Sequence, residues 1–360
     1  MSKIKIFVTY FTDDKPYIGS DIYQPIMAGN VGRQLPNGFI GDDTGDNISQ
    51  LNQCYGELTA HYWIFKNYMP TAKEEYIGLC HYRRFLHFGR SEEEVINLGR
   101  EYPESPINLT FYKYFTDYIF DKYNENNILS VIGGYDVIGT YKWDFVNRTN
   151  RVQFDYHHIS SEMDRALEVI ADIYPDYTKY AEDFLNDDKG YYCFCTIMKR
   201  DLLEDYFTWQ FNILHELAKD NKWEQYAELR DLGLPEYEKV RQYREIRMPA
   251  FIMERLYNVW IRYQIDKNKI KMLELPCNIL ASPNEVFPVQ RTKFIKQLAL
   301  ENKAIEPYYM DEITAKHPIL NALVRLLVKR RKYYKLLGDS KSFFYDSHSL
   351  MLRLIGVFYK

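Results

Sequence analysis

Short apolar runs that are typical of buried strands alternate with amphipathic helical segments, and this alternation constrains the fold of the chain more than any other feature. We expect strand material at residues 4–9, 76–82, 129–132, 135–139 and 191–198, and helices at about 49–67, from about 162, at about 201–217 and at 247–263. Strands that alternate with helices predict an α/β sandwich with a largely parallel sheet. Ligands of such sheets bind beyond the carboxyl ends of the strands, which here means Tyr10, His81–Arg84 and the residues from Gly139 onward.

Residues 10–51 contain many glycines and prolines, and we expect them to form a long ordered loop with little regular structure. Loops of this length inside a compact domain are usually functional. The loop ends in an acidic stretch, Asp42–Ser49, which leads into the first expected helix. The carboxylate and amide groups of this stretch suit hydrogen bonds to ribose or sugar hydroxyls, or a divalent cation. The alternative is a solvated turn followed by a helix cap.

The sequence His81-Tyr82-Arg83-Arg84 ends one of the apolar strands, where an open α/β sheet presents its ligand-binding groups. Guanidinium groups at such a position can bind a diphosphate bidentately and stabilise charge on a leaving nucleotide. A surface ion pair is the alternative role for one of the two arginines, so we expect one of them to face the site.

Two other places in the sequence could take part in chemistry. His157 and His158 come just before an expected helix N-terminus, where free amides and the helix dipole favour a phosphate; a structural or solvent-facing histidine is the alternative. Glu254 lies in an apolar helical segment, where an unpaired carboxylate is seldom buried. It is therefore either paired with Arg255 or Arg247, or a working base.

Several common catalytic motifs are absent from the sequence. There is no Gly-x-Gly-x-x-Gly and no phosphate loop with Gly-Lys-Ser/Thr, which argues against a dinucleotide enzyme or a nucleoside triphosphatase. The lack of a Gly-x-Ser-x-Gly elbow argues against a hydrolase with a serine nucleophile. No Asp-x-Asp pair occurs, so a metal-diphosphate clamp of that type is not visible, and the need for a Mg or Mn ion stays open.

Charge and cysteine content limit the partners and the compartment. The net charge of -4 gives no general basic footprint for nucleic acid. The 5 cysteines form an odd set without metal-type spacing, which favours a reduced, cytosolic environment, and we expect Cys193 and Cys195 to be small core residues. The sequence shows no signal peptide and no apolar run of roughly 18 residues, so we predict a protein that is made and kept inside the cell.

Residues 321–360 are strongly basic and carry only Asp339 and Asp346 as acidic groups. Apolar residues around Leu323 fall on one helical face and basic residues such as Lys329 on the other, which is the pattern of an interfacial helix on an anionic membrane. An ordinary docking helix with a solvated basic face is the alternative.

Blocks of sequence in a fixed order suggest a family. They are Gly41–Ser49, Asn52, Glu57–Asn67 and Tyr76–Arg84, followed by landmarks at residues 135–138, His158, 197–200 and 251–256. In their order and spacing over residues 3–265 they resemble glycosyltransferase family 111, bacterial capsule and O-antigen enzymes long catalogued as a domain of unknown function. One departure is the strand at 194–198, where the family usually has an Asn, and this departure leaves the exact substrate open.

The resemblance implies an α/β, GT-A-like fold: a single Rossmann-type nucleotide-sugar-binding domain with a mixed sheet, which we expect over residues 1–300. The helical basic extension that we expect over 301–360 lies outside the resemblance and follows from the charge pattern. It implies inverting transfer of β-galactofuranose from UDP-galactofuranose to a glycan acceptor carried on a polyprenyl diphosphate. Such an enzyme would be cytoplasmic and peripheral on the inner face of the cell membrane, with the extension on the anionic surface. The alternatives are another UDP-sugar, such as UDP-galactose or UDP-glucose, and a non-catalytic glycan-binding scaffold.

Inversion needs a carboxylate base for the acceptor hydroxyl and stabilisation of the departing diphosphate. By motif position, the resemblance assigns the base to Glu254, with Asp136 as the second choice. The donor-binding residues assigned in the same way are Thr9, Tyr10, Asp43, Asp46, Asn47, His81, Tyr82, Arg83, Arg84 and His158.

Overall fold

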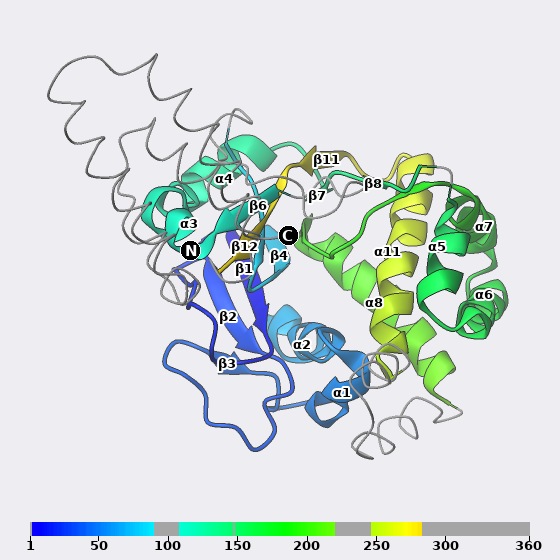
Figure 1. The fold of residues 1–360 in the computed structure, drawn as a ribbon, viewed down its shortest axis with the longest axis horizontal. Coiled ribbons are helices and arrows are strands. Elements are labelled where there is room, and N and C mark those ends of the chain that lie inside the picture. Colours follow the sequence, from blue (N-terminus) through cyan, green and yellow to red (C-terminus); the bar gives the residue numbers. More distant parts are fainter. Residues whose placement is uncertain (1, 90–107, 147, 220–245, 283–360) are drawn as a thin grey trace, which may run out of the picture. The chain divides into compact units, whose positions relative to one another are not determined.

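The computed structural model describes residues 2–89, 108–146, 148–219 and 246–282 (Figure 1). These residues divide between two compact units. The first unit holds the described residues up to 88 and those of 121–278, and contains the candidate site. The second unit holds residues 89, 108–120 and 279–282 of the described part.

A mostly parallel sheet forms the centre of the first unit. Its strands are β1 (Ile4–Tyr10), β2 (Tyr23–Met27), β3 (Ile40–Gly41), β4 (Tyr76–His81), β5 (Arg84–Leu86), β7 (Val137–Thr140), β10 (Thr196–Lys199) and β11 (Met272–Leu275). The strands lie in the order β11-β7-β10-β4-β1-β2-β3. Strand β10 runs antiparallel to both its neighbours, β4 and β7. The other pairs along this order are parallel: β11 with β7, β4 with β1, β1 with β2, and β2 with β3. The expected α/β fold with a largely parallel, mixed sheet is therefore confirmed.

Helices of the first unit pack beside this sheet. They are α1 (Asn52–Tyr55), α2 (Leu58–Trp63), α4 (Glu125–Ile132), α5 (Asn150–His157), α6 (Ser160–Ile173), α7 (Thr178–Asn186), α8 (Arg200–Ala218) and α11 (Met248–Asp266). Figure 1 shows α8 and α11 between the sheet and the group formed by α5, α6 and α7. A small ribbon of β8 (Trp143–Asp144) and β9 (Lys189–Gly190) completes the unit.

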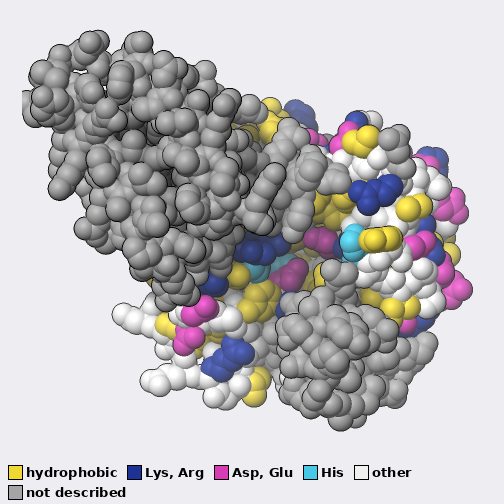
Figure 2. Space-filling model, in the orientation of Figure 1, with side chains coloured by type: hydrophobic (Ala, Val, Ile, Leu, Met, Phe, Trp, Pro, Cys, Tyr) yellow, Lys and Arg dark blue, Asp and Glu magenta, His cyan; other side chains and the backbone are white. Residues whose placement is uncertain are grey.

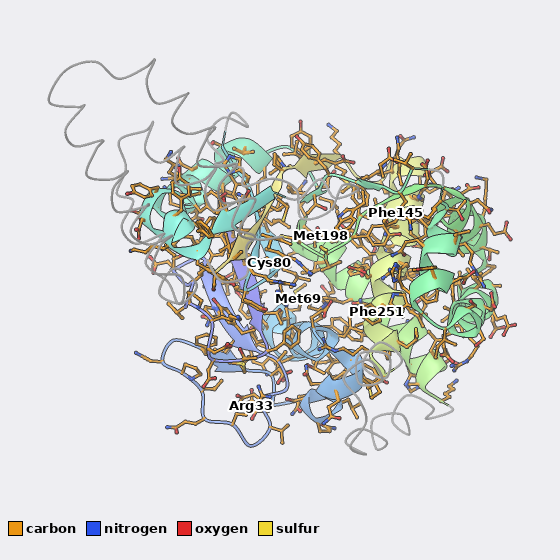
Figure 3. The ribbon with its side chains drawn as sticks, viewed as in Figure 1. Arg33, Met69, Cys80, Phe145, Met198 and Phe251 are labelled. Atoms are coloured by element: carbon orange, nitrogen blue, oxygen red, sulfur yellow. The ribbon has the colours of Figure 1, made fainter. Side chains whose placement is uncertain are left out.

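Apolar and aromatic side chains from the sheet and from α8 and α11 make a continuous core. Cys80 and Met198 lie on the sheet and Phe251 on α11 (Figure 3). Aromatic rings fill much of this space: Tyr206 of α8 packs edge-on against Trp260 of α11, with ring centroids 5.3 Å apart. The burial of such large rings explains much of a composition with 33 Tyr and 21 Phe.

Two of the expected elements differ in the structure. Residues 10–51 are not loop throughout, because they contain β2 and β3. Pro25 lies inside β2 opposite Val8 of β1, and a proline is a poor signal for a strand. Residues 129–132 are not strand but belong to α4, whose N-cap Asn124 accepts a hydrogen bond from the amide of Asn127.

The expected helix at 49–67 is interrupted. Gly56 has φ of 54° and separates α1 from α2, and a π-turn at Ile64–Tyr68 follows α2. The expected strand at 191–198 begins only at Thr196, because Cys193 adopts φ of 60°, which no strand residue has. Cys193 is partly exposed and is not the core residue that we expected, whereas Cys195 is buried.

The second unit contributes β6 (Asn108–Phe111) and α3 (Tyr112–Tyr118) to the described part. Tyr114 and Phe115 of α3 are buried. The strand β12 (Cys277–Ala281) ends in this unit. The boundary at residue 300 and the basic extension at 301–360 lie outside the described residues. In the part of the chain that is described, no helix combines the length and the apolar character needed to cross a membrane.

Candidate active site

The candidate site lies where β1 and β4 end. Thr9 of β1 is paired with His81 of β4, and the amide of Tyr82 donates to the carbonyl of Thr9 over 2.9 Å. His81 also pairs with Arg84 of β5 in an antiparallel register, so Tyr82 and Arg83 form the tight turn between β4 and β5. The turn therefore presents the expected His81–Arg84 motif at the carboxyl edge of the sheet.

The polar groups of this motif are only partly satisfied by the protein. Nδ1 of His81, Nε of Arg83 and Nε of Arg84 are buried atoms with no hydrogen-bond partner among the residues described. Within the same residues, neither arginine forms an ion pair shorter than 4.0 Å. Buried donors of this kind are costly unless a ligand or water satisfies them. Both arginines thus keep an Nε donor that no described residue accepts, and their binding of an anion stays a prediction.

Positive charge is concentrated around His81. Burial lowers the pKa of His81 well below its usual value, and the charges of Arg84, Arg83 and Arg247 lower it further, so the ring is neutral at pH 7. Burial also disfavours the charged form of Arg84, but Cys193, Glu254 and Glu57 outweigh it and raise the pKa of the guanidinium. Arg84 is therefore held as a cation among two nearby carboxylates.

Arg247 joins this cluster, although the sequence indicated it only as a partner for Glu254. It immediately precedes α11, and its guanidinium carbon lies 5.1 Å from the ring centroid of Phe11, the residue after β1. A Cβ atom added to Gly56 would come 3.1 Å from Nη2 of Arg247. The bare backbone at Gly56 thus lets the guanidinium lie close to the start of α2.

Glu254 is paired with Arg255, which is one of the alternatives that the sequence left open. Its Oε1 accepts the amide of Cys193 over 2.7 Å, and its Oε2 accepts Nη1 of Arg255 over 2.6 Å. The side chain of Arg255 is 4% exposed, and its Nη2 donates to Gln153 of α5 over 3.0 Å. Glu254 therefore anchors the left-handed turn at Cys193 and neutralises a buried guanidinium.

His158 packs against α11, one helical turn from Glu254. It is the C-cap residue of α5, and its ring stacks on Phe251, one helical turn before Glu254, with centroids 4.2 Å apart. The helix α6 begins two residues later, at Ser160, as the position of His158 before a helix N-terminus predicted.

The acidic loop after β3 is held by hydrogen bonds to the segment that follows β2 and to Ser49. Asp42 is fully buried and accepts the amides of Gly29 and Asn30 over 2.9 and 3.0 Å, together with the hydroxyl of Ser49. Asp43 accepts the side-chain amide of Asn30 over 3.0 Å. The loop lies at the same sheet edge, because β3 pairs in parallel with β2.

The other two loop residues that we assigned to donor binding also have hydrogen-bond partners within the protein. The main-chain N–H of Asp46 donates to the side-chain oxygen of Asn67, and the side-chain nitrogen of Asn67 donates to the carbonyl of Asp46. The carboxylate of Asp46 accepts a hydrogen bond from the hydroxyl of Tyr62 over 3.2 Å. Asn47 accepts the amide of Ser49 over 3.2 Å. Asp46 is exposed and Asn47 partly exposed, so both can still reach a ligand, and their donor-binding role stays a prediction.

The comparisons with known proteins agree with this architecture. A family described as a domain of unknown function, DUF4422, matches residues 5–267. The chain belongs to this family. A solved structure described as the bifunctional glycosyltransferase WbbM, in its apo form, is similar with a TM-score of 0.61 and 26% sequence identity. The similarity covers 78% of this chain but 46% of that one, so the chain spans less than half of that protein's length. No curated protein matches the chain.

Asp136 of this DUF4422 domain is not brought to the candidate site. It precedes β7, and it pairs with Lys199 over 2.7 Å and with the amide of Lys271 over 2.7 Å. Lys199 is opposite Tyr76, the first residue of β4, whereas His81 is the last. Five residues of strand, or about 16 Å, separate the two ends. Asp136 therefore lies at the opposite sheet edge, where burial raises the pKa of its carboxyl group but Lys199 and Lys271 more than compensate and lower it.

The side chains of Thr9 and Tyr10 lie inside the DUF4422 domain. Thr9 is 2% and Tyr10 0% exposed. The Tyr10 hydroxyl donates to the carbonyl of Pro16 over 2.9 Å and accepts the amide of Ile18 over 3.0 Å. The side chain of Tyr10 thus holds the loop after β1, and the donor-binding roles of Thr9 and Tyr10 stay predictions.

Charged groups of both signs gather at this site. On the face shown in Figure 2, basic, acidic and histidine side chains of the described residues lie close together near the centre. No group of three or more His, Cys, Asp or Glu side chains in the described part is arranged to hold a metal ion. The sequence did not indicate Glu57 and Arg247 as site residues, because only the tertiary fold brings them near Arg84 and His81. The one local signal was Gly56, a glycine directly before Glu57.

Proposed function

We propose that this DUF4422 domain is a glycosyltransferase that moves a sugar from a nucleotide-diphosphate donor to a hydroxyl of a glycan. The observation that carries the proposal is the cluster of Arg83, Arg84 and Arg247 around a neutral His81, beyond the carboxyl ends of β1 and β4. The similarity to a solved bifunctional glycosyltransferase supports it.

The chemistry of glycosyl transfer suits these groups. When the bond between the sugar and the diphosphate breaks, negative charge develops on the diphosphate oxygens, and fixed cations aimed at that position stabilise the transition state. Guanidinium groups bind such oxygens bidentately. The unsatisfied Nε atoms of Arg83 and Arg84 are donors of the required kind.

The finer assignment follows the resemblance to glycosyltransferase family 111. On that assignment the donor is UDP-galactofuranose, transfer inverts the anomeric centre, and the acceptor is a capsular or O-antigen glycan on a polyprenyl diphosphate at the inner face of the cell membrane. UDP-galactose and UDP-glucose are the competing donors. A non-catalytic glycan-binding scaffold remains the competing function.

A donor panel tests the proposal directly. The full chain is incubated with UDP-galactofuranose, UDP-galactose or UDP-glucose and a synthetic polyprenyl-diphosphate-linked glycan, and the product is detected by mass spectrometry. Product with one donor supports catalysis and identifies the sugar. Absence of product with all of them contradicts the enzyme proposal and favours the scaffold.

Arg83→Ala tests the role of the arginine cluster. We expect turnover to fall by about 10- to 150-fold, because one lost charge-assisted interaction is worth about 1.5–3 kcal/mol and the charge on the diphosphate is greatest in the transition state. Arg200→Ala is the matched control, since Arg200 pairs with Asp201 at the start of α8. Equal rates for the two variants would refute the diphosphate role.

A further inference from the structure

Two carboxylates lie near Arg84, and their surroundings differ. Both oxygens of Glu254 already accept a hydrogen bond, one from Cys193 and one from Arg255. The carboxylate of Glu57 is partly exposed and has no hydrogen bond or ion pair with any residue in the described part of the chain. A proton taken up by Glu254 would weaken its ion pair with the buried guanidinium of Arg255, whereas the Glu57 carboxylate has no such partner among the described residues and is the more available base.

We infer that Glu57 is the catalytic base of the proposed glycosyl transfer and that Glu254 is a positioning residue. This inference rests on the proposed function. It reassigns the role that motif position gave to Glu254, and it does so from the hydrogen bonds of the two side chains.

The backbone around Glu57 fixes the start of α2 beside the arginine cluster. Asn52 donates to the carbonyl of Gly56 over 2.7 Å, and the hydroxyl of Thr59 donates to the same oxygen over 3.2 Å. Gly56, with φ of 54°, lies against the guanidinium of Arg247. Glu57 thus begins its helix at a rigid turn that two side chains hold in place.

The carboxylate of Glu57 lies close enough to the arginine cluster to interact with it. Arg84 is close enough for the Glu57 carboxylate to stabilise its charge, and the attraction is mutual. The other carboxylates described in the acidic loop already have partners: Asp42 is fully buried and accepts three hydrogen bonds, and Asp43 and Asp46 accept one each, from Asn30 and Tyr62. Asp136 is at the opposite edge.

The step balances without any further reactant. The acceptor hydroxyl oxygen forms a bond to the anomeric carbon, and the bond from that carbon to the diphosphate oxygen breaks. The electron pair of the broken bond leaves with the diphosphate, whose charge the arginines stabilise. The hydroxyl proton passes to Glu57, which returns it to solvent after the product leaves.

The closing experiment compares Glu57→Gln, Glu57→Asp and Glu254→Gln in the full chain, using the donor that the panel identifies and the same synthetic lipid-linked glycan. Glu57→Gln breaks no hydrogen bond with a described residue, and we expect kcat to fall by about 100- to 10,000-fold. The acidic limb of the pH–rate profile should disappear with it. Glu57→Asp should restore part of the rate together with that limb.

Binding of UDP, measured by titration calorimetry, separates the base from a residue that merely positions Arg84. Glu57→Gln removes a negative charge near the anion site, so the Kd for UDP should stay within about 3-fold of wild type or become smaller. A weaker affinity with unchanged kcat, or a Glu57→Gln variant that keeps its rate and acidic limb, would overturn the inference while leaving the proposed function intact. A wild-type chain that transfers no sugar would overturn both.

Discussion

Asn258 links α11 to the segment that carries Cys193, and its removal should be costly. The side chain is 2% exposed. Its Oδ1 accepts the amide of Tyr191 over 2.6 Å, while its Nδ2 donates to the carbonyls of Tyr191 and Glu254 over 2.9 and 3.2 Å. Asn258 therefore pairs with the main chain of Tyr191 in both directions, as a neighbouring strand would.

Asn258→Ala leaves both main-chain groups of Tyr191 without this partner. Each buried polar group left unsatisfied costs about 1–3 kcal/mol, so we expect a loss of about 2–6 kcal/mol in the free energy of unfolding. Alanine favours the helix by up to about 0.7 kcal/mol, which offsets part of the loss. Asn212→Ala is the matched control, because Asn212 is an exposed residue of α8 with one bond, to the Tyr174 hydroxyl over 2.8 Å.

Urea unfolding followed by tryptophan fluorescence measures the difference, since Trp209 and Trp260 are buried in α8 and α11. The helix-propensity gain is common to both variants and cancels in the comparison. The Asn258 variant should unfold at a clearly lower urea concentration than the Asn212 variant. If the two midpoints coincide, the pairing between Asn258 and Tyr191 does not stabilise the fold and the argument is refuted.

Two further variants test the structure near the site. Gly56→Ala should weaken UDP binding by about 3- to 10-fold, because its Cβ would displace Arg247. The control is Gly134→Ala, where φ is 91° and no atom lies within 4 Å of the added Cβ, so only backbone strain of about 1–2 kcal/mol is expected. Equal UDP affinities of the two variants would contradict this prediction. Burial lowers the pKa of His61 to about 3, so below about pH 6.5 the unfolded chain binds a proton at this residue that the folded protein excludes. The contribution of His61 to the free energy of unfolding is therefore complete above that pH and falls by up to about 1.4 kcal/mol per pH unit below it. His61→Phe should flatten this dependence in urea titrations at pH 4–7, and an unchanged slope would assign it to other groups.

The sequence predicted the elements whose signals are local. The apolar runs at β1, β4 and β7 and the long periodic segments of α8 and α11 appear close to where they were expected. Short or conflicting signals were less informative. In β2, Pro25 concealed a strand that its parallel partner β1 stabilises, and at residues 125–132 the capping by Asn124 outweighs an apolar run that resembles a strand.

The candidate site was predicted in part for the same reason. The rule that ligands bind at the carboxyl ends of strands located His81–Arg84 correctly at the sheet edge, because it needs only the strand and its direction. It could not locate Arg247 beside Gly56 or Glu57 near Arg84, since those contacts depend on how α2 and α11 pack. Asp136 precedes β7 and so lies at the amino end of that strand, at the edge opposite the candidate site. The sequence alone did not give the direction of β7 in the sheet, so it could not exclude Asp136.

The hydrogen bonds around Glu254 also determine how its variants must be interpreted. Glu254 holds the amide of Cys193, whose φ of 60° is unfavourable for a residue with a side chain, and it neutralises Arg255, whose side chain is 4% exposed. Its removal would leave a buried guanidinium without its carboxylate, a change that typically costs about 3–5 kcal/mol. Lost activity in a Glu254 variant would therefore report on the turn at Cys193 as well as on chemistry. Glu57→Gln breaks no such contact with a described residue, so its loss of activity, taken together with unchanged UDP affinity and the lost acidic limb, identifies the base.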